Sequence, residues 1–146
     1  MHGAAGSVGS TATQLAREFG AHVIGTGRAA DRQKALGFGA MEFVDLDNDA
    51  LEDVGGVDPA FDVIGGDIQQ RSAGQIRPGG TLVTIAGPLQ ARPASGRAVD
   101  FVVESDRAQL GEVVQRVRDG RLRTSGSAGR RSSAFAREGH ALLNAP

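Results

Sequence analysis

Cysteine, tryptophan and tyrosine are absent from this 146-residue sequence, and Lys34 is its only lysine. Without cysteine, the sequence offers no disulfide, no thiolate ligand for zinc and no cysteine nucleophile. No apolar run is long enough to cross a bilayer. A formal net charge of −1 gives no overall attraction to nucleic acid or to an anionic membrane. We therefore expect a soluble, cytoplasmic globular domain that has no nucleic-acid or membrane partner.

Short apolar segments alternate with helical patterns along the chain. We predict strands over residues 22–27, 41–46, 60–66, 81–87 and 99–105. We predict helices over residues 7–19, 30–36 and 68–76, the last one ended by the sequence Arg-Pro-Gly-Gly at 77–80. A fourth helix follows and ends at Gly120. Strands that alternate with helices imply crossover connections, so we expect an α/β, Rossmann-like fold with a mostly parallel sheet and helices on both faces.

Two of these helices carry apolar stripes that we expect to face the core. The stripe of the first helix consists of Val8, Ala12, Leu15, Ala16 and Phe19. The stripe of the last helix consists of Leu110, Val113, Val114 and Val117. From Arg121 onward the composition changes, with five arginines against one glutamate. We interpret residues 124–146 as a flexible tail rich in Arg, Ser, Gly and Ala.

A glycine pattern near the start, Ala4-x-Gly6-x-x-Gly9, is typical of a dinucleotide-binding turn, with alanine at the first glycine position. Gly6 permits close approach of a pyrophosphate, and Gly9 lets the following helix lie against the sheet. Alone, the pattern fits any glycine-rich turn of an α/β protein equally well. Further glycines at the ends of later strands, residues 65–66 and Gly87, favour a cofactor site. Only two residues precede the turn, so we expect the first strand to be largely missing.

The residues at the end of the strand expected over 22–27 indicate which dinucleotide binds. An NAD site places an acidic residue there, whereas this chain has Gly27 followed by Arg28. A small residue followed by a guanidinium accepts a 2′-phosphate through charge-assisted hydrogen bonds. The sequence therefore favours NADP. The alternative interpretation of Arg28 is an ordinary solvated charge at the end of a helix.

Five segments, in this order, resemble the cofactor domain of the medium-chain dehydrogenase/reductase superfamily. They are "HGAAGSVGSTATQLAREFGAHVIGT", "LGFGAMEFVD", "FDVIGGD", "IRPGGTLVTIAGP" and "VDFVVESDRAQLGEVVQRVRDGRLR". The branch they resemble most is the zinc-independent quinone oxidoreductases, also described as zinc-binding dehydrogenases. The resemblance implies an NADP-binding Rossmann-like domain over residues 1–123. It also implies hydride transfer from NADPH to quinones, enones or related carbonyls.

The resemblance further implies which residues contact the cofactor. The pyrophosphate loop matches Ala5, Gly6, Ser7 and Val8, and the 2′-phosphate region matches Gly27 and Arg28. The family's loop at the end of the strand expected over 60–66 matches Ile64, Gly65 and Gly66. The nicotinamide side matches Ala86, Gly87, Phe101, Val102 and Val103. Each apolar member of this set is equally compatible with core packing.

The chain departs from the family pattern in ways that affect its activity. We expect it to lack the N-terminal barrel that carries the family's substrate pocket, and its last residues do not resemble the apolar strand that ends the family's fold. We therefore expect no catalytic residue in this chain and no turnover by it alone.

Other chemistries find little support in the sequence. A short-chain dehydrogenase needs a catalytic tyrosine, and a P-loop needs Gly-Lys-Ser/Thr, both of which are missing. The three histidines are too scattered to predict a metal site. Two classes of function remain. One is the cofactor-binding part of an oxidoreductase, and the other is a non-catalytic module that binds a dinucleotide or pairs with another chain, with homo-oligomer formation left open.

Overall fold

The structure, a computed structural model, describes residues 1–124, so the predicted tail lies almost entirely outside the described residues. The α-helices are α1 (Ser7–Glu18), α2 (Arg32–Gly37), α3 (Asp67–Ala73) and α4 (Arg107–Arg118). Two 3-10 helices are η1 (Ala29–Asp31) and η2 (Leu51–Val54). The strands are β1 (Ile24–Gly27), β2 (Glu42–Asp45), β3 (Val57–Asp62), β4 (Ile76–Thr84) and β5 (Arg97–Asp100).

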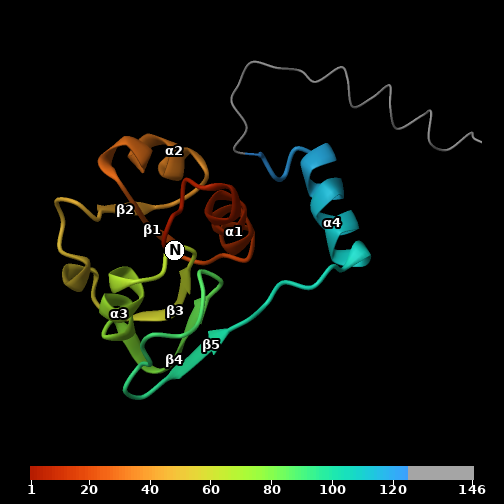
Figure 1. Ribbon diagram of the computed structural model, residues 1–146. Coiled ribbons are helices and arrows are strands. Elements are labelled where there is room, and N and C mark those ends of the chain that lie inside the picture. The colour runs from red at the N-terminus through yellow and green to blue at the C-terminus, as the bar shows by residue number, and fades with distance from the viewer. Residues whose placement is uncertain (125–146) are drawn as a thin grey trace, which may run out of the picture.

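All strand pairs are parallel, as the alternation of strands and helices predicts. The pairs form a two-stranded sheet, β1-β2, and a three-stranded sheet, β3-β4-β5. Figure 1 shows the two sheets on either side of the N-terminus. The element order and the parallel pairing confirm the Rossmann-like α/β fold.

The first four residues connect the two sheets. His2 forms an isolated parallel bridge with Thr26 of β1, and its backbone N–H donates to the carbonyl of Phe61 in β3 at 2.9 Å. On the β1 side, Thr26 N–H donates to the Met1 carbonyl at 3.0 Å, and Ala4 N–H donates to the Thr26 carbonyl at 3.1 Å. The expected first strand is thus reduced to a single bridge with β1, and one further backbone hydrogen bond links His2 to β3.

Each sheet has a small apolar core of its own. The core beside β1 and β2 consists of Ala4, Ala5, Ala35, Ala40 and Phe43. The core beside β3 and β4 consists of Ala60, Ala73 and Leu82. Helix α2 packs on β1 and β2, while α3 packs on β4. Because alanine dominates both clusters, little apolar area is buried in either one, and the backbone links through His2 contribute to holding the halves together.

Several predicted element boundaries are wrong, and two of the differences have a clear cause. Residues 77–80 do not end a helix but lie inside β4, where the ladder to β3 shifts from the pair Val57–Ile76 to the pair Pro59–Thr81. The extra residues are accommodated as a bulge, and Pro78, which has no N–H, is exposed there. The last predicted strand also ends early, at Asp100, because its partner β4 ends at Thr84.

The apolar stripes of the helices differ from the prediction as well. The buried residues of α1 are Gly9, Ser10 and Thr13, whereas Phe19 is 80% exposed. Small side chains face the sheet because α1 lies close to the backbone of residues 3–4. Helix α4 has no buried residue. It is anchored at its C-terminal end, where Glu18 of α1 forms ion pairs with Arg116 and Arg121. None of the helices in residues 1–124 is long and apolar enough to cross a bilayer.

Candidate functional site

The turn before α1 has the geometry of a glycine-rich phosphate loop. Gly3 adopts a φ of +67°, a backbone conformation that side chains disfavour, and a Cβ at this residue would lie 2.8 Å from Val63. A Cβ at Gly9 would lie 2.0 Å from the Gly3 carbonyl oxygen. The turn can therefore fold back against the first helical turn only with glycine at these positions.

The N-terminus of α1 is open to an anion. Gly6 occupies the N-cap position, so no side chain caps the helix, and the first turn contains no acidic residue. The first N–H groups of a helix have no intrahelical partner and carry a partial positive charge. Gly6, Ser7 and Val8 are exposed at this end. The side chain of Ala5, by contrast, is buried in the core beside Phe43, which leaves its backbone as the part that can face a ligand.

A buried carboxylate, which the sequence analysis did not identify, organises the next loop. Asp62, the last residue of β3, is fully buried and accepts hydrogen bonds from the backbone N–H groups of Ile64 and Gly65 at 2.9 and 3.0 Å. Burial opposes ionisation of Asp62, but these N–H groups and the hydroxyl of Thr84 outweigh it and lower its pKa. An aspartate within an apolar strand, directly before a glycine pair, is the sequence signal that could have revealed this role.

The same carboxylate connects the loop after β3 to the loop after β4. Thr84, the last residue of β4, donates its hydroxyl to Asp62 at 3.0 Å and accepts the N–H of Ala86 at 3.1 Å. The two loops also touch directly, since a Cβ at Gly65 would lie 3.1 Å from the Cβ of Ala86. Of the predicted residues of these loops, Ile64, Gly65 and Ala86 thus donate their N–H groups to the buried side chains of Asp62 and Thr84, and Gly66 and Gly87 lie next to them in the chain.

Arg28 follows the last residue of β1 and is exposed. Its side chain forms no ion pair in the described part of the chain. Gly27, directly before it, is buried beside Phe43 and Asp31. The neighbouring Arg32 is engaged, because its guanidinium lies 5.2 Å from the centre of the Phe43 ring and 3.7 Å from an Asp49 oxygen. Arg28 is therefore the cation at this end of β1 that is available to a ligand.

The predicted nicotinamide segment is arranged differently from the expectation. Phe101, Val102 and Val103 lie beyond β5 without regular secondary structure, and their exposed fractions are 48, 89 and 72%. They follow the carboxyl end of β5, on the same side of the sheet as the ends of β3 and β4. The structure thus places these three residues just beyond the carboxyl edge of the sheet, where they are exposed to solvent.

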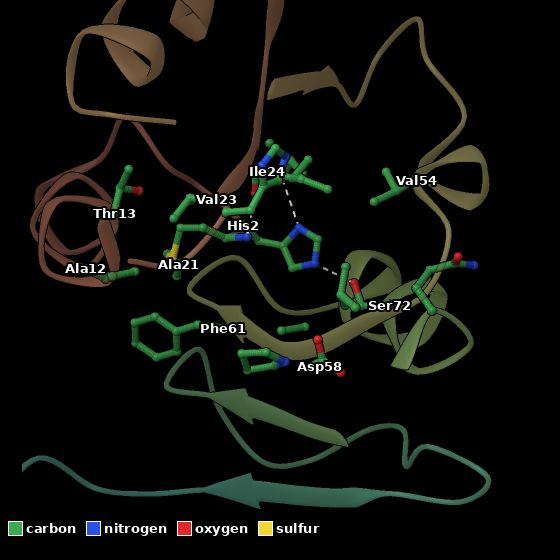
Figure 2. Close-up of a pocket in the computed structure, with 18 of the residues that line it drawn as sticks. His2, Ala12, Thr13, Ala21, Val23, Ile24, Val54, Asp58, Phe61 and Ser72 are labelled. Carbon is green, nitrogen blue, oxygen red and sulfur yellow. Dashed lines mark hydrogen bonds between the residues drawn. The ribbon is translucent and has the colours of Figure 1, made fainter. Parts of the chain in front are cut away.

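The predicted residues therefore share the carboxyl edge of the parallel strands, which is where open α/β sheets bind their ligands. Gly3 contacts the loop after β3, and that loop contacts the loop after β4. Two cavities formed by described residues, one between β1 and β3 (Figure 2) and one beside β1 and β2, include none of the predicted cofactor residues. The candidate site is thus an open edge formed by loops and by a helix N-terminus.

The chain matches a known protein family over most of its length. Residues 7–116 match the family described as zinc-binding dehydrogenase. The chain belongs to that family. No curated protein matches the sequence. The zinc in the family's description has no counterpart in residues 1–124, which contain no group of three or more His, Asp or Glu side chains suited to hold a metal ion.

Solved structures of this family's fold resemble the chain. A quinone oxidoreductase from Coxiella burnetii is 24% identical with a TM-score of 0.78, and the match covers 84% of this chain and 41% of that one. An Escherichia coli quinone oxidoreductase complexed with NADPH is 24% identical with a TM-score of 0.72, covering 84% and 45%. A 2-haloacrylate reductase is 24% identical with a TM-score of 0.70, covering 83% and 46%. The chain spans less than half the length of these structures.

Proposed function

We propose that this chain is the NADP(H)-binding portion of an oxidoreductase that transfers hydride to quinones, enones or related carbonyls. One observation carries the proposal. The uncapped N-terminus of α1 lies at the same edge of the parallel strands as the loops after β3 and β4, which hydrogen bonds of Asp62 and Thr84 hold together. Such an edge offers backbone N–H groups and a helix dipole to a pyrophosphate, and an ordered surface to the rest of a dinucleotide.

The residues at this edge have distinct roles in the proposal. The backbone of Ala5 and Gly6, with the N–H groups of Ser7 and Val8, binds the pyrophosphate, and Arg28 beside Gly27 binds the 2′-phosphate. Residues 64–66 and 86–87 line the ribose and nicotinamide, with the backbone of residues 101–103 along the ring. When bound, the nicotinamide supplies the hydride, while these residues bind and orient it.

The acceptor class is inferred from the named relatives. One solved structure of this fold is a quinone oxidoreductase complexed with NADPH, and another is a 2-haloacrylate reductase. Both names describe reduction of a conjugated, electron-poor acceptor. For this chain we therefore propose an acceptor with a carbonyl or an activated double bond.

The described residues do not enclose a hydride acceptor. The segment 101–103 is exposed, and water exclusion and positioning supply much of the rate of a hydride transfer. We therefore expect the chain alone to bind NADPH without reducing a simple quinone. Consumption of NADPH above the buffer rate in a steady-state assay with such a quinone would contradict this expectation.

The binding proposal is tested by titrating the full chain with NADPH and NADH in a calorimeter. We expect tighter binding of NADPH, and Arg28→Ala should weaken NADPH binding by about 2 kcal/mol while leaving NADH unchanged, because only NADPH carries the 2′-phosphate. Arg118→Ala removes the same charge from an exposed site on α4 and serves as the control. Equal affinity for the two dinucleotides, or no effect of Arg28→Ala, would refute the proposal.

A second candidate is a non-catalytic module that pairs with another chain. The observation that favours it is the exposed apolar segment of Phe101, Val102 and Val103, together with the unburied apolar residues of α4. Light scattering across a range of protein concentrations measures the molecular mass of the isolated chain and so tests whether the chain pairs with a second copy. A concentration-dependent dimer that Val102→Asp disrupts would support the module.

A further inference from the structure

Gln69 is a glutamine whose side chain is enclosed by the fold. It is the third residue of α3, and only 1% of its surface is exposed. Ser72, on the same face of α3 one turn later, lies 2.6 Å from Nε2 of His2 (Figure 2), so the helix that carries Gln69 is itself fixed. An amide that is buried loses its hydrogen bonds to water. Gln69 therefore needs protein partners for both ends of its amide.

The two ends of this amide bond to two different parts of the protein. Nε2 of Gln69 donates to Oδ2 of Asp62 at 3.4 Å, and its Oε1 accepts the backbone N–H of Gln90 at 2.5 Å. These partners fix the orientation of the amide. A backbone N–H can only donate, and the carboxylate of Asp62, whose pKa is lowered, can only accept. An aliphatic side chain offers neither group and a carboxylate lacks the donor, so glutamine suits both partners.

The loop after β4 is consequently fixed at two points. At the start of the loop, the hydroxyl of Thr84 accepts the N–H of Ala86 at 3.1 Å. Further along the loop, Gln69 accepts the N–H of Gln90. Thr84 also donates to Oδ2 of Asp62 at 3.0 Å, which is the same oxygen that Gln69 bonds. Both fixed points of the loop are therefore tied to one buried carboxylate.

The segment between the two fixed points, residues 87–89, is open toward a ligand. Gly87 has a φ of +136°, and no heavy atom of the described residues lies within 4 Å of the place where its Cβ would be. Residues 86–88 are exposed. An exposed loop that becomes ordered only when a ligand binds loses part of the binding free energy to that ordering. The bonds at Ala86 and Gln90 order this loop in advance.

We propose that Gln69 is a positioning residue for the nicotinamide half of the cofactor, and that it acts by holding residues 87–89 in place through the N–H of Gln90. The inference rests on the proposed function, in which residues 86–87 line the ribose and the nicotinamide. The adenine half of the cofactor binds beside Arg28, at the end of β1, which belongs to the other sheet. Binding of that half should not depend on Gln69.

Two ligands separate the two halves of the site in calorimetric titrations of the full chain. NADPH contains both halves, whereas adenosine 2′,5′-bisphosphate carries the adenine and the 2′-phosphate without the nicotinamide. We expect the unsubstituted chain to bind NADPH more tightly than the bisphosphate. Gln69→Met keeps the length of the side chain and removes both polar groups, so it should weaken NADPH binding about fivefold and leave bisphosphate binding unchanged. Gln70→Met, at the exposed neighbouring residue of α3, is the control and should change neither affinity.

A second pair of variants tests the same link from the loop and leaves the buried side chain intact. Gln90→Pro removes the backbone N–H that Gln69 accepts, whereas Ala94→Pro makes the same change at an exposed residue later in the loop. We expect only Gln90→Pro to weaken NADPH binding, by the same factor as Gln69→Met. Combining Gln69→Met with Gln90→Pro should weaken NADPH no further, because both changes break one link. If Gln69→Met does not fold, the two proline variants decide.

The outcomes separate failure of this inference from failure of the proposed function. Equal weakening of both ligands by Gln69→Met would reduce Gln69 to a structural role, and full NADPH affinity in Gln90→Pro would show that the N–H of Gln90 carries no effect. Equal affinity of the unsubstituted chain for NADPH and the bisphosphate would also overturn the inference, while a preference for NADPH over NADH would leave the proposed function standing. Equal affinity for NADPH and NADH would refute the proposed function, and the inference with it.

Discussion

The carboxyl and amino ends of β1 and β3 differ in how their polar groups are satisfied. At the carboxyl ends, residues 1–4 bridge the strands, and Asp62 and Thr84 tie the following loops together. At the amino ends, the same two strands face each other across a cleft of about 460 Å³. The carboxyl edge of the parallel strands is thus ordered although the gap between β1 and β3 is only partly filled. The buried side chains of Asp62 and Thr84 supply hydrogen bonds there in place of a strand ladder.

The largest change should come from removing the carboxylate that orders the carboxyl edge. In Asp62→Ala the backbone N–H groups of Ile64 and Gly65 and the buried hydroxyl of Thr84 lose their acceptor, so we expect a loss of about 4 kcal/mol in the free energy of unfolding. Urea unfolding followed by circular dichroism measures it. Asp58→Ala, which removes an exposed ion pair with Arg77, should cost less than about 1 kcal/mol. Similar losses in both variants would show that Asp62 has no special role.

The pH dependence of stability tests the residue that closes the inner end of the cleft. Burial, with the adjacent Met1 ammonium, lowers the pKa of His2 to about 4 from 6.5, although Asp62 opposes this. Below pH 6.5 the unfolded chain therefore binds a proton that the folded chain does not. The stability from neutral His2 is fully present above pH 6.5 and falls by about 3 kcal/mol as the pH drops to 4.

The Met1 amine adds to this pH dependence at higher pH. Burial lowers its pKa from 8.0 to about 6, so stability should already begin to fall between pH 8 and pH 6. Urea unfolding at pH 8, 7, 6, 5 and 4 measures both effects. His22→Gln, at an exposed histidine paired with Glu42, is the control and should keep the same profile. A flat profile from pH 8 to 5 would contradict the burial of Met1 and His2.

The smallest change concerns a hydroxyl beside the cleft. The Oγ1 of Thr13 is buried and has no hydrogen-bond partner among residues 1–124. Thr13→Val keeps the shape and removes this unsatisfied group, so we expect a gain of about 1 kcal/mol and a melting temperature higher by about 4 °C. Thr11→Val provides the comparison, because Thr11 already donates to the Ser7 carbonyl at 3.1 Å. A destabilised Thr13→Val would show that the hydroxyl is satisfied in solution.

The glycine turn, the start of α1 and the alternation of strands and helices could be predicted because each leaves a local signal. Gly3 has a positive φ and lies against the Val63 side chain, and Gly9 lies against the Gly3 backbone, so neither position allows a side chain. The buried face of α1 could not be read from apolar spacing, because the residues that fit against residues 3–4 are the small Ser10 and Thr13. The bulge in β4 depends on pairing with β3, which lies outside any local pattern.

The site was predicted less completely than the fold. The loop residues carried over from the family resemblance lie at one edge, but Asp62, which orders two of the loops, was missed. Its role depends on a carboxylate in β3 meeting Thr84, 22 residues later in the sequence, through tertiary structure. The cleft was not predicted either, because it arises from how far apart β1 and β3 lie and from how little of the gap residues 1–4 fill.

Amide hydrogen exchange of the full chain with and without NADPH tests most directly the proposal that the cofactor binds at the carboxyl edge. NADPH should slow exchange at residues 6–9 and in the loops at 64–66 and 86–87, and it should leave residues 22–24 and 57–61 beside the cleft unchanged. Protection centred on the cleft, or no protection at a saturating NADPH concentration, would contradict the assignment of the carboxyl edge to the cofactor.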